Sequence, residues 1–372
     1  MQIVEFTADS LRFAESLPAQ APLDGFVWVF LDRDSLTDAL PSLQDAAYRL
    51  GGSRMLDLHC KDLSNDAHPS HYDYTSVYDL IIFRRLATAS ESEAAHGPAP
   101  TGKPKPGIPA FHRIDSRAVG FAVFDRLLIS VHPHGCATAR SFIDRFLADA
   151  QFNVDASAAR SRIPSNPSDL VLRMVNAMVD SYLAVRKDLA AQLGHWQTEL
   201  LKPQTRFTDW NALMAARSQL HVLEDLCDEQ HDAMQEWLDS LREQPMASFD
   251  ANHQLAHAKR DLLVARARDV IEHIERVMHH ARRLEQSAET VVQVHFSAQS
   301  NRTNDIMRTL TAITAVFLPL NLITGFFGMN FEVFPILHRP NALWWTMGTM
   351  VGIAALLGLI FWRKRYLART GR

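Results

Sequence analysis

Two apolar runs in the last quarter of the chain decide its fold. They read TLTAITAVFLPLNLITGFF over residues 309–327 and WWTMGTMVGIAALLGLIFW over residues 344–362, and neither contains a charged residue. Each run has 19 residues. At a helical rise of about 1.5 Å per residue, each spans roughly 28 Å, close to the thickness of the bilayer hydrocarbon. We expect two transmembrane helices; the alternative is a pair of buried helices in a large soluble core.

The residues that flank these runs predict a topology. Trp344 and Trp362 bracket the second run, as expected for side chains at the membrane interface. The tail 363–372 carries five Lys and Arg, whereas the loop 328–343 carries only Arg339. By the positive-inside rule, both chain ends lie in the cytoplasm and the loop faces the periplasm. We therefore expect a membrane protein with two spans and both termini in the cytoplasm.

Composition mainly excludes some classes of partner and site. The 372 residues include 38 Lys+Arg and 42 Asp+Glu, which gives a formal charge of −4, so we expect no nucleic-acid partner. Cys60, Cys136 and Cys227 are too far apart in sequence for a CxxC metal site and too few for a disulfide framework. The N-terminus has no basic stretch followed by an apolar run, so we expect no signal peptide.

Upstream of the membrane the sequence predicts helices. The 73 residues between Pro245 and Pro319 contain no proline or glycine, which is typical of one continuous helix of roughly 110 Å. We also expect helices over 169–201 and 208–242, and we assign 166–300 to a cytosolic helical stalk. An apolar face packs either within one subunit or against copies of the same helix. Its residues are Leu262, Leu263, Val270, Ile274, Val277 and Leu284.

The sequence pattern of the first part of the chain predicts alternating strands and helices. Short β-branched and aromatic runs predict strands over 25–31, 78–86 and 119–131. Helical patterns follow at 35–50 and 138–152. We assign 1–165 to a cytosolic α/β domain, within which the proline-rich stretch 88–109 reads as a flexible insertion.

Eight positions in and just after the segment 301–327 recur with a 3.5-residue period, and six of them are polar or small. We call this set the polar stripe, and it is made of Asn304, Met307, Thr311, Thr314, Leu318, Asn321, Gly325 and Gly328. Polar groups that face lipid are costly, so the stripe should face other helices or water. One interpretation is a tight helix–helix interface.

The other interpretation is a pore, ringed by copies of this helix. Asn304 and Asn321 then provide rings of carbonyl oxygens, while Met307, Leu310 and Leu318 form apolar constrictions that close by dewetting. Both interpretations stay open on residue pattern alone.

Three segments in this region resemble a known family. SNRTNDIMRTLT over 300–311, FLPL over 317–320 and GFFGMNF over 325–331 closely resemble the CorA magnesium-transporter family, whose Gly-Met-Asn signature ends the first of two C-terminal membrane helices. The detailed resemblance covers about residues 297–335.

The resemblance implies a homopentameric funnel whose pore is lined by the first membrane helix, 301–327. It implies that Gly328, Met329 and Asn330 form the outer selectivity ring, that Asn304 forms a polar ring near the cytoplasmic end, and that Leu310 and Leu318 are constrictions. Mg²⁺ is the implied cargo, with Co²⁺ and Ni²⁺ as further cargo. Because Mg²⁺ dehydrates reluctantly, Asn330 oxygens would hold the ion through its waters.

The resemblance also implies regulation by cytosolic Mg²⁺. Alignment without gaps from the pore segment assigns the regulatory metal ligand to Asp269; the alternative is a solvated helix charge, because Arg266 and Arg268 flank it. Gln293 stands where some family members have an acid. Ile336 stands at a loop position that is often Glu, which leaves Glu332 as the acid of the loop.

Seventeen histidines keep a transition-metal alternative open. His132, His134 and Cys136 are close in sequence, as are His273, His279 and His280, but packed or surface histidines explain both groups better. A zinc transporter of the same superfamily is one alternative function, although the intact Met329 favours magnesium. A membrane-anchored scaffold or sensor is another. We find no Ser-His-Asp order, HExxH or nucleotide-binding loop, so we expect neither an enzyme nor an organic cofactor.

Overall fold

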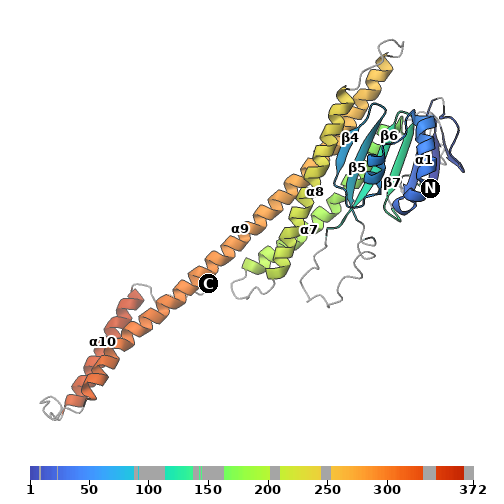
Figure 1. Cartoon of the computed structure of the whole chain (residues 1–372). Coiled ribbons are helices and arrows are strands. Elements are labelled where there is room, and N and C mark those ends of the chain that lie inside the picture. The colour runs from blue at the N-terminus through green and yellow to red at the C-terminus, as the bar shows by residue number, and fades with distance from the viewer. Residues whose placement is uncertain are drawn as a thin grey trace. The chain divides into compact units, whose positions relative to one another are not determined.

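The computed structural model describes residues 1–7, 10–22, 24–87, 91, 114–136, 142, 144, 163–201, 210–243, 253–329 and 341–363 (Figure 1). The predicted insertion 88–109 and the predicted helix 138–152 fall almost entirely outside these residues. The chain forms two compact units, Met1–Glu289 and Thr290–Arg372.

A seven-stranded sheet is the centre of the first unit, in the order β2-β1-β3-β7-β6-β5-β4. The strands are β1 (Gln2–Phe6), β2 (Leu11–Ala14), β3 (Phe26–Asp32), β4 (His71–Tyr74), β5 (Tyr78–Leu86), β6 (Ser116–Phe124) and β7 (Leu127–His132). Adjacent strands run antiparallel, except for β3 and β7, which are parallel with Val27 paired to Leu127.

Both faces of the central strands are buried, which explains their nearly continuous apolar sequence. One face packs against η1 (Arg33–Ser35), α1 (Leu36–Gly51) and α2 (Asp57–Ser64), with Leu43 and Leu63 as fully buried contacts. The other face carries Trp28, whose Nε1 donates to Ser130 Oγ at 2.8 Å. The strand predicted over 119–131 is wrong in one respect, because it is two strands that turn at the exposed Asp125 and Arg126.

Two helices anchor the stalk to the sheet. α6 (Pro167–Asp180) starts at Asn166, whose side chain accepts from Asp169 N at 2.7 Å. The helix predicted over 169–201 is interrupted at Ser181, after which α7 (Tyr182–Leu201) begins. From α8 (Trp210–Glu243), Gln230 Nε2 donates to the carbonyl of Arg84 in β5 at 2.5 Å.

The long helix α9 (His253–Phe327) confirms the predicted continuous helix and includes Pro319. Within the first unit α9 contacts α6, α7 and α8 of its own chain. Gln197 Nε2 donates to Ser287 Oγ at 2.7 Å, and Arg282 pairs with Glu224. The apolar face therefore packs within one subunit over this part, as one of the two alternatives predicted, although Leu262 is exposed.

The second unit holds the rest of α9 and α10 (Ala342–Arg363). Both helices contain stretches long and apolar enough to cross a membrane, and protein buries almost none of these stretches. These bounds contain both predicted runs, 309–327 and 344–362.

Candidate ion pathway

The polar stripe lies on one exposed face of α9. Asn304, Thr311, Thr314, Asn321 and Gly325 are all exposed. The apolar members are exposed too: Leu318 is 68% accessible, and Met307 and the neighbouring Leu310 are each more than half accessible. No described part of this chain covers the stripe.

The opposite face of α9 is the covered one. Ala312 is only 3% exposed, and the half-buried positions that share its face are Val316, Pro319, Leu320, Ile323 and Phe327. At about 100° per residue, this face points away from the polar stripe. α10 is the other described helix of the same unit and is drawn alongside this part of α9 (Figure 1). The hairpin therefore leaves the polar stripe for something other than α10.

The threonine hydroxyls of the stripe are already oriented. Thr311 Oγ1 donates to the carbonyl of Met307 at 2.8 Å, and Thr314 Oγ1 donates to the carbonyl of Leu310 at 2.9 Å. Because each hydroxyl proton is used within the helix, the oxygen lone pairs are what the helix offers outward. Such oxygens accept hydrogen bonds from the water shell of a cation.

The stripe ends at a glycine turn. Gly328 N donates to the carbonyl of Thr324 at 2.9 Å, and Met329 N donates to the carbonyl of Phe326 at 3.4 Å. A Cβ at position 328 would lie 3.0 Å from the Thr324 carbonyl oxygen, tighter than an ordinary contact. Met329 is exposed. Asn330, Glu332 and Ile336 lie outside the described residues, so their predicted roles stay predictions.

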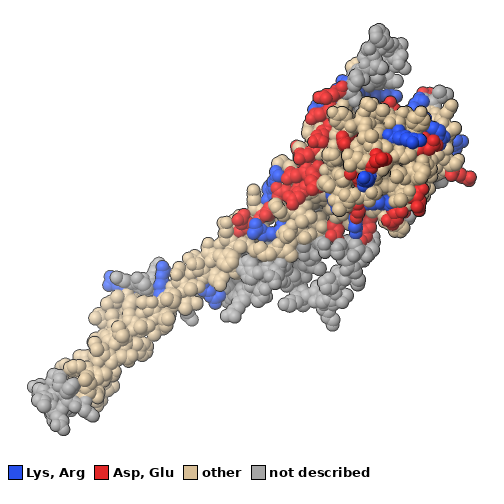
Figure 2. Space-filling model, in the orientation of Figure 1, with Lys and Arg blue, Asp and Glu red and all other residues tan. Residues whose placement is uncertain are grey.

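Charge is confined to the ends of this region. Asp305 lies 3.7 Å from Arg308, one turn before the apolar run. Between Arg308 and Arg363 the described residues include no Lys, Arg, Asp or Glu, and Figure 2 shows this stretch in tan on the face drawn. An ion on this path would therefore meet amide, hydroxyl and carbonyl oxygens, not formal charges, over the described length.

The predicted regulatory acid Asp269 is exposed and has a histidine beside it. His273 Nε2 lies 3.8 Å from Asp269 Oδ1, while His273 Nδ1 lies 3.4 Å from Asp180 Oδ1 at the end of α6. The flanking Arg266 does not pair with Asp269, since it contacts the buried Asp169. Two carboxylates and an imidazole thus meet where α6 adjoins α9.

The sequence motif of His132, His134 and Cys136 does not form a common site. His132 and Cys136 are buried, whereas His134 is exposed and lies 3.5 Å from Asp32. Burial, with Arg85 and Arg33 nearby, lowers the pKa of His132 to about 3. This histidine is a neutral core residue.

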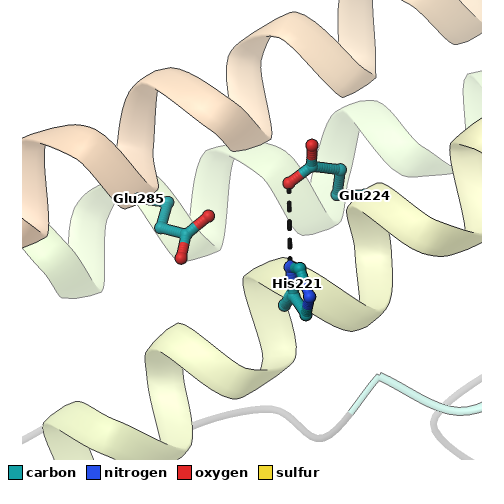
Figure 3. A group of neighbouring side chains, drawn as sticks. All are labelled: His221, Glu224 and Glu285. Carbon is teal, nitrogen blue, oxygen red and sulfur yellow. Dashed lines mark ion pairs between the residues drawn. The ribbon is translucent and has the colours of Figure 1, made fainter.

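A different cluster escaped the sequence analysis. His221 and Glu224 of α8 and Glu285 of α9 place an imidazole nitrogen and two carboxylate oxygens within 4.8 Å of one another (Figure 3). The spacing of His221 and Glu224 puts them on one helical turn, which is a weak signal. Glu285 is distant in sequence, so only the packing of α9 on α8 reveals the group.

Known proteins that resemble this chain include cation transporters. The family described as CorA-like Mg²⁺ transporter protein matches residues 25–365. The magnesium transport protein CorA of Haemophilus ducreyi is 23% identical over 341 residues, 86% of this chain and 98% of that protein. The cobalt/magnesium transport protein CorA of Thermotoga maritima is 32% identical over 100 residues. This second match spans 27% of this chain and only 28% of that protein's length.

Solved structures share the fold over almost all of the chain. The CorA magnesium transporter of Methanocaldococcus jannaschii superposes with a TM-score of 0.70 at 14% identity, covering 97% of each chain. The full-length CmaX protein gives a TM-score of 0.57 at 18% identity, covering 98% of this chain and 97% of its own. Since the family match covers most of the sequence, this chain belongs to the CorA-like Mg²⁺ transporter family.

Proposed function

We propose that the chain conducts Mg²⁺ into the cell, with Co²⁺ and Ni²⁺ as further cargo, through a pore lined by the polar stripe of several copies. The observation that carries this proposal is the exposure of the stripe on the face of α9 turned away from α10. Oxygen-bearing side chains on a membrane helix need water or other helices as partners. Copies arranged around an axis supply both, and the family resemblance favours five.

The pore has wide polar rings and narrow apolar ones. Asn304, Thr311, Thr314 and Asn321 give rings of oxygens, with Gly325 keeping the outer end open. Met307, Leu310 and Leu318 form rings that exclude water when the helices close together. A closed state therefore needs only a small inward movement of the helices.

Selection takes place at the outer mouth, by Gly328, Met329 and Asn330, with Glu332 raising the local cation concentration. Asn330 amide oxygens and backbone carbonyls would hold Mg²⁺ through its first water shell, so hydrated size and charge set the preference. The tight approach of position 328 to the Thr324 carbonyl supports a requirement for glycine there.

The membrane potential drives uptake, and no enzymatic step is required. A divalent ion that moves inward gains about 4.6 kcal/mol per 100 mV of inside-negative potential, twice the single-charge value. We place the protein in the inner membrane with both termini in the cytoplasm and the loop 328–343 outside. Its partners are the bilayer, divalent cations and other copies of the chain.

Cytosolic Mg²⁺ closes the pore by binding at Asp269. The exposure of this carboxylate supports an ion-binding role, as does Asp180, which contacts the other ring nitrogen of His273, because carboxylates attract a divalent cation. Relief of this inhibition should appear as continued flux at high internal Mg²⁺ in Asp269→Asn.

The test is Mg²⁺ influx into proteoliposomes that hold a Mg²⁺-sensitive dye, at an imposed inside-negative potential. We expect wild-type influx to rise with the potential and Asn330→Ala to lose it. Asn341→Ala is the matched control, since Asn341 is an exposed asparagine at the other end of the loop.

Loss of flux in Asn330→Ala but not in Asn341→Ala supports the selectivity ring. Zn²⁺ influx without Mg²⁺ influx would assign the chain to zinc transport instead. If folded oligomers pass neither ion, the proposal is wrong and the two helices act as an anchor.

A further inference from the structure

We propose that His221, Glu224 and Glu285 bind a divalent transition-metal ion of the Zn²⁺, Co²⁺ and Ni²⁺ class between α8 and α9. All three residues belong to the unit Met1–Glu289, whereas the polar stripe belongs to the unit Thr290–Arg372. The site is therefore separate from the proposed pore, and its existence does not depend on the proposed function.

The donors come from two helices that already pack together. His221 and Glu224 project from one turn of α8, and Glu285 faces them from α9 (Figure 3). His221 Nδ1 lies 3.9 Å from Glu224 Oε2. Ligand atoms at about 2.0–2.2 Å from a tetrahedral zinc ion are roughly 3–3.6 Å apart. His221 Nδ1 and Glu224 Oε2 are therefore slightly further apart than a bound ion requires.

The histidine is free to close this difference. His221 is 67% exposed, so its ring can rotate without disturbing the core, while the two glutamates are half-buried and fixed. An ion that draws the imidazole inward by a rotation of this side chain completes a three-residue site, and water fills the remaining coordination positions.

Two arginines hold the glutamates in place. Arg282 Nε donates to Glu224 Oε1 at 2.5 Å, and an Arg217 guanidinium nitrogen lies 3.5 Å from Glu285 Oε1. Glu224 Oε2 is the oxygen turned to His221, so the arginine and the proposed ion use different oxygens of that carboxylate. Arginines at the back of a ligating carboxylate act as outer-shell partners that orient it.

The donor set selects the class of ion. Imidazole nitrogen suits Zn²⁺, Co²⁺ and Ni²⁺, whereas Mg²⁺ prefers oxygen ligands and retains most of its waters. The nearby Cys227 is not a candidate ligand, because it is buried and desolvation raises the pKa of its thiol to about 12.

The experiment uses the full chain in detergent micelles, stripped of metal and titrated with Zn²⁺ alone and with Co²⁺ alone. Equilibrium dialysis counts the bound Zn²⁺ ions per chain, and visible absorption reports the ligand field of Co²⁺. The variants are His221→Ala and Glu285→Gln. The matched control is His279→Ala, an exposed histidine on α9 away from the cluster. Sites elsewhere in the chain contribute equally to every sample, so only the difference matters.

We expect wild type and His279→Ala to bind one more Zn²⁺ per chain than His221→Ala, with one Co²⁺ absorption component lost in His221→Ala and Glu285→Gln. A large excess of Mg²⁺ should leave that ion in place. Equal binding in wild type and His221→Ala, or displacement by Mg²⁺, would overturn the proposal. Because His221 is exposed, failure to fold does not complicate the result, and neither outcome depends on transport.

Discussion

The sheet and the membrane hairpin differ in how far they expose apolar side chains of the same type. In the sheet, Leu128 of β7 is fully buried between neighbours of its own chain, whereas Leu356 of α10 is 58% exposed. Trp28 is buried with a hydrogen-bonded indole, while Trp344 and Trp345 are 73% and 76% exposed.

This difference shows which side chains find their partners within one chain and which do not. The first unit builds its apolar core from its own side chains and pairs many of its buried polar groups, although Arg85 Nε, His132 Nδ1 and Gln230 Oε1 are buried with no hydrogen-bond partner among the described residues. The hairpin exposes leucines on one side and threonine and asparagine oxygens on another. Lipid suits the apolar sides, whereas the polar stripe needs water or other helices as its partners.

The largest effect expected from this comparison is on stability. Leu128→Ala should lower the free energy of unfolding of the first unit by about 2–5 kcal/mol, through lost burial and an unfilled cavity. The same substitution at Leu356 should change it by no more than about 0.5 kcal/mol. Pulse proteolysis of the full chain in urea and detergent micelles measures both. A large effect at Leu356 would mean that α10 packs against protein at that position.

The next effect concerns the buried histidine of the sheet. His132 has a pKa of about 3 in the folded chain against 6.5 as its ordinary value, so the unfolded chain binds a proton that the folded chain rejects. Stability from this residue is complete above pH 6.5 and is lost as the pH falls towards 3. Between pH 7 and pH 5 the loss should be about 2 kcal/mol.

Replacing this histidine should remove that pH dependence. His132→Phe keeps a ring beside Phe30 and Phe121 and should flatten the profile between pH 7 and pH 5. His134→Phe is the control, since His134 is exposed and has no comparable burial. If both variants kept the wild-type slope, other groups would account for the acid sensitivity of the sheet.

The smallest effect concerns the polar stripe itself. Thr314→Val keeps the shape of the side chain but removes an oxygen that faces away from α10. A lost hydrogen bond of about 1 kcal/mol corresponds to roughly fivefold slower Mg²⁺ flux. Thr349→Val in α10 should leave flux unchanged, because Thr349 makes the same kind of intrahelical hydrogen bond as Thr314 but does not belong to the polar stripe. Equal slowing in both variants would place the path elsewhere.

Much of the hairpin could be predicted from sequence because length and apolarity suffice there. The runs 309–327 and 344–362 lie within α9 and α10, and the 3.5-residue period of the stripe correctly indicated one helical face. Period arithmetic works on a long uninterrupted helix, where each position has a fixed angular offset from the last.

The sheet and the cluster of His221, Glu224 and Glu285 were harder to predict, for identifiable reasons. β6 and β7 merged into one predicted strand, since the turn at Asp125 and Arg126 contains neither glycine nor proline. β2 is short, mixed in polarity and only partly covered, so no alternation marks it. Glu285 joins His221 only through the packing of α9 on α8, and tertiary contacts of this kind leave no local pattern.

The parallel pairing of β3 with β7 has a consequence for synthesis. Val27 in β3 can pair with Leu127 in β7 only after another hundred residues have been synthesised, so the middle of the sheet forms late. At about 5–20 residues per second, a ribosome needs roughly 5–20 s to supply that partner. During this interval the apolar strand Phe26–Asp32 has one open edge, the kind of segment that chaperones shield from self-association. The order of the strands thus leaves this apolar edge open well before the membrane segments are made.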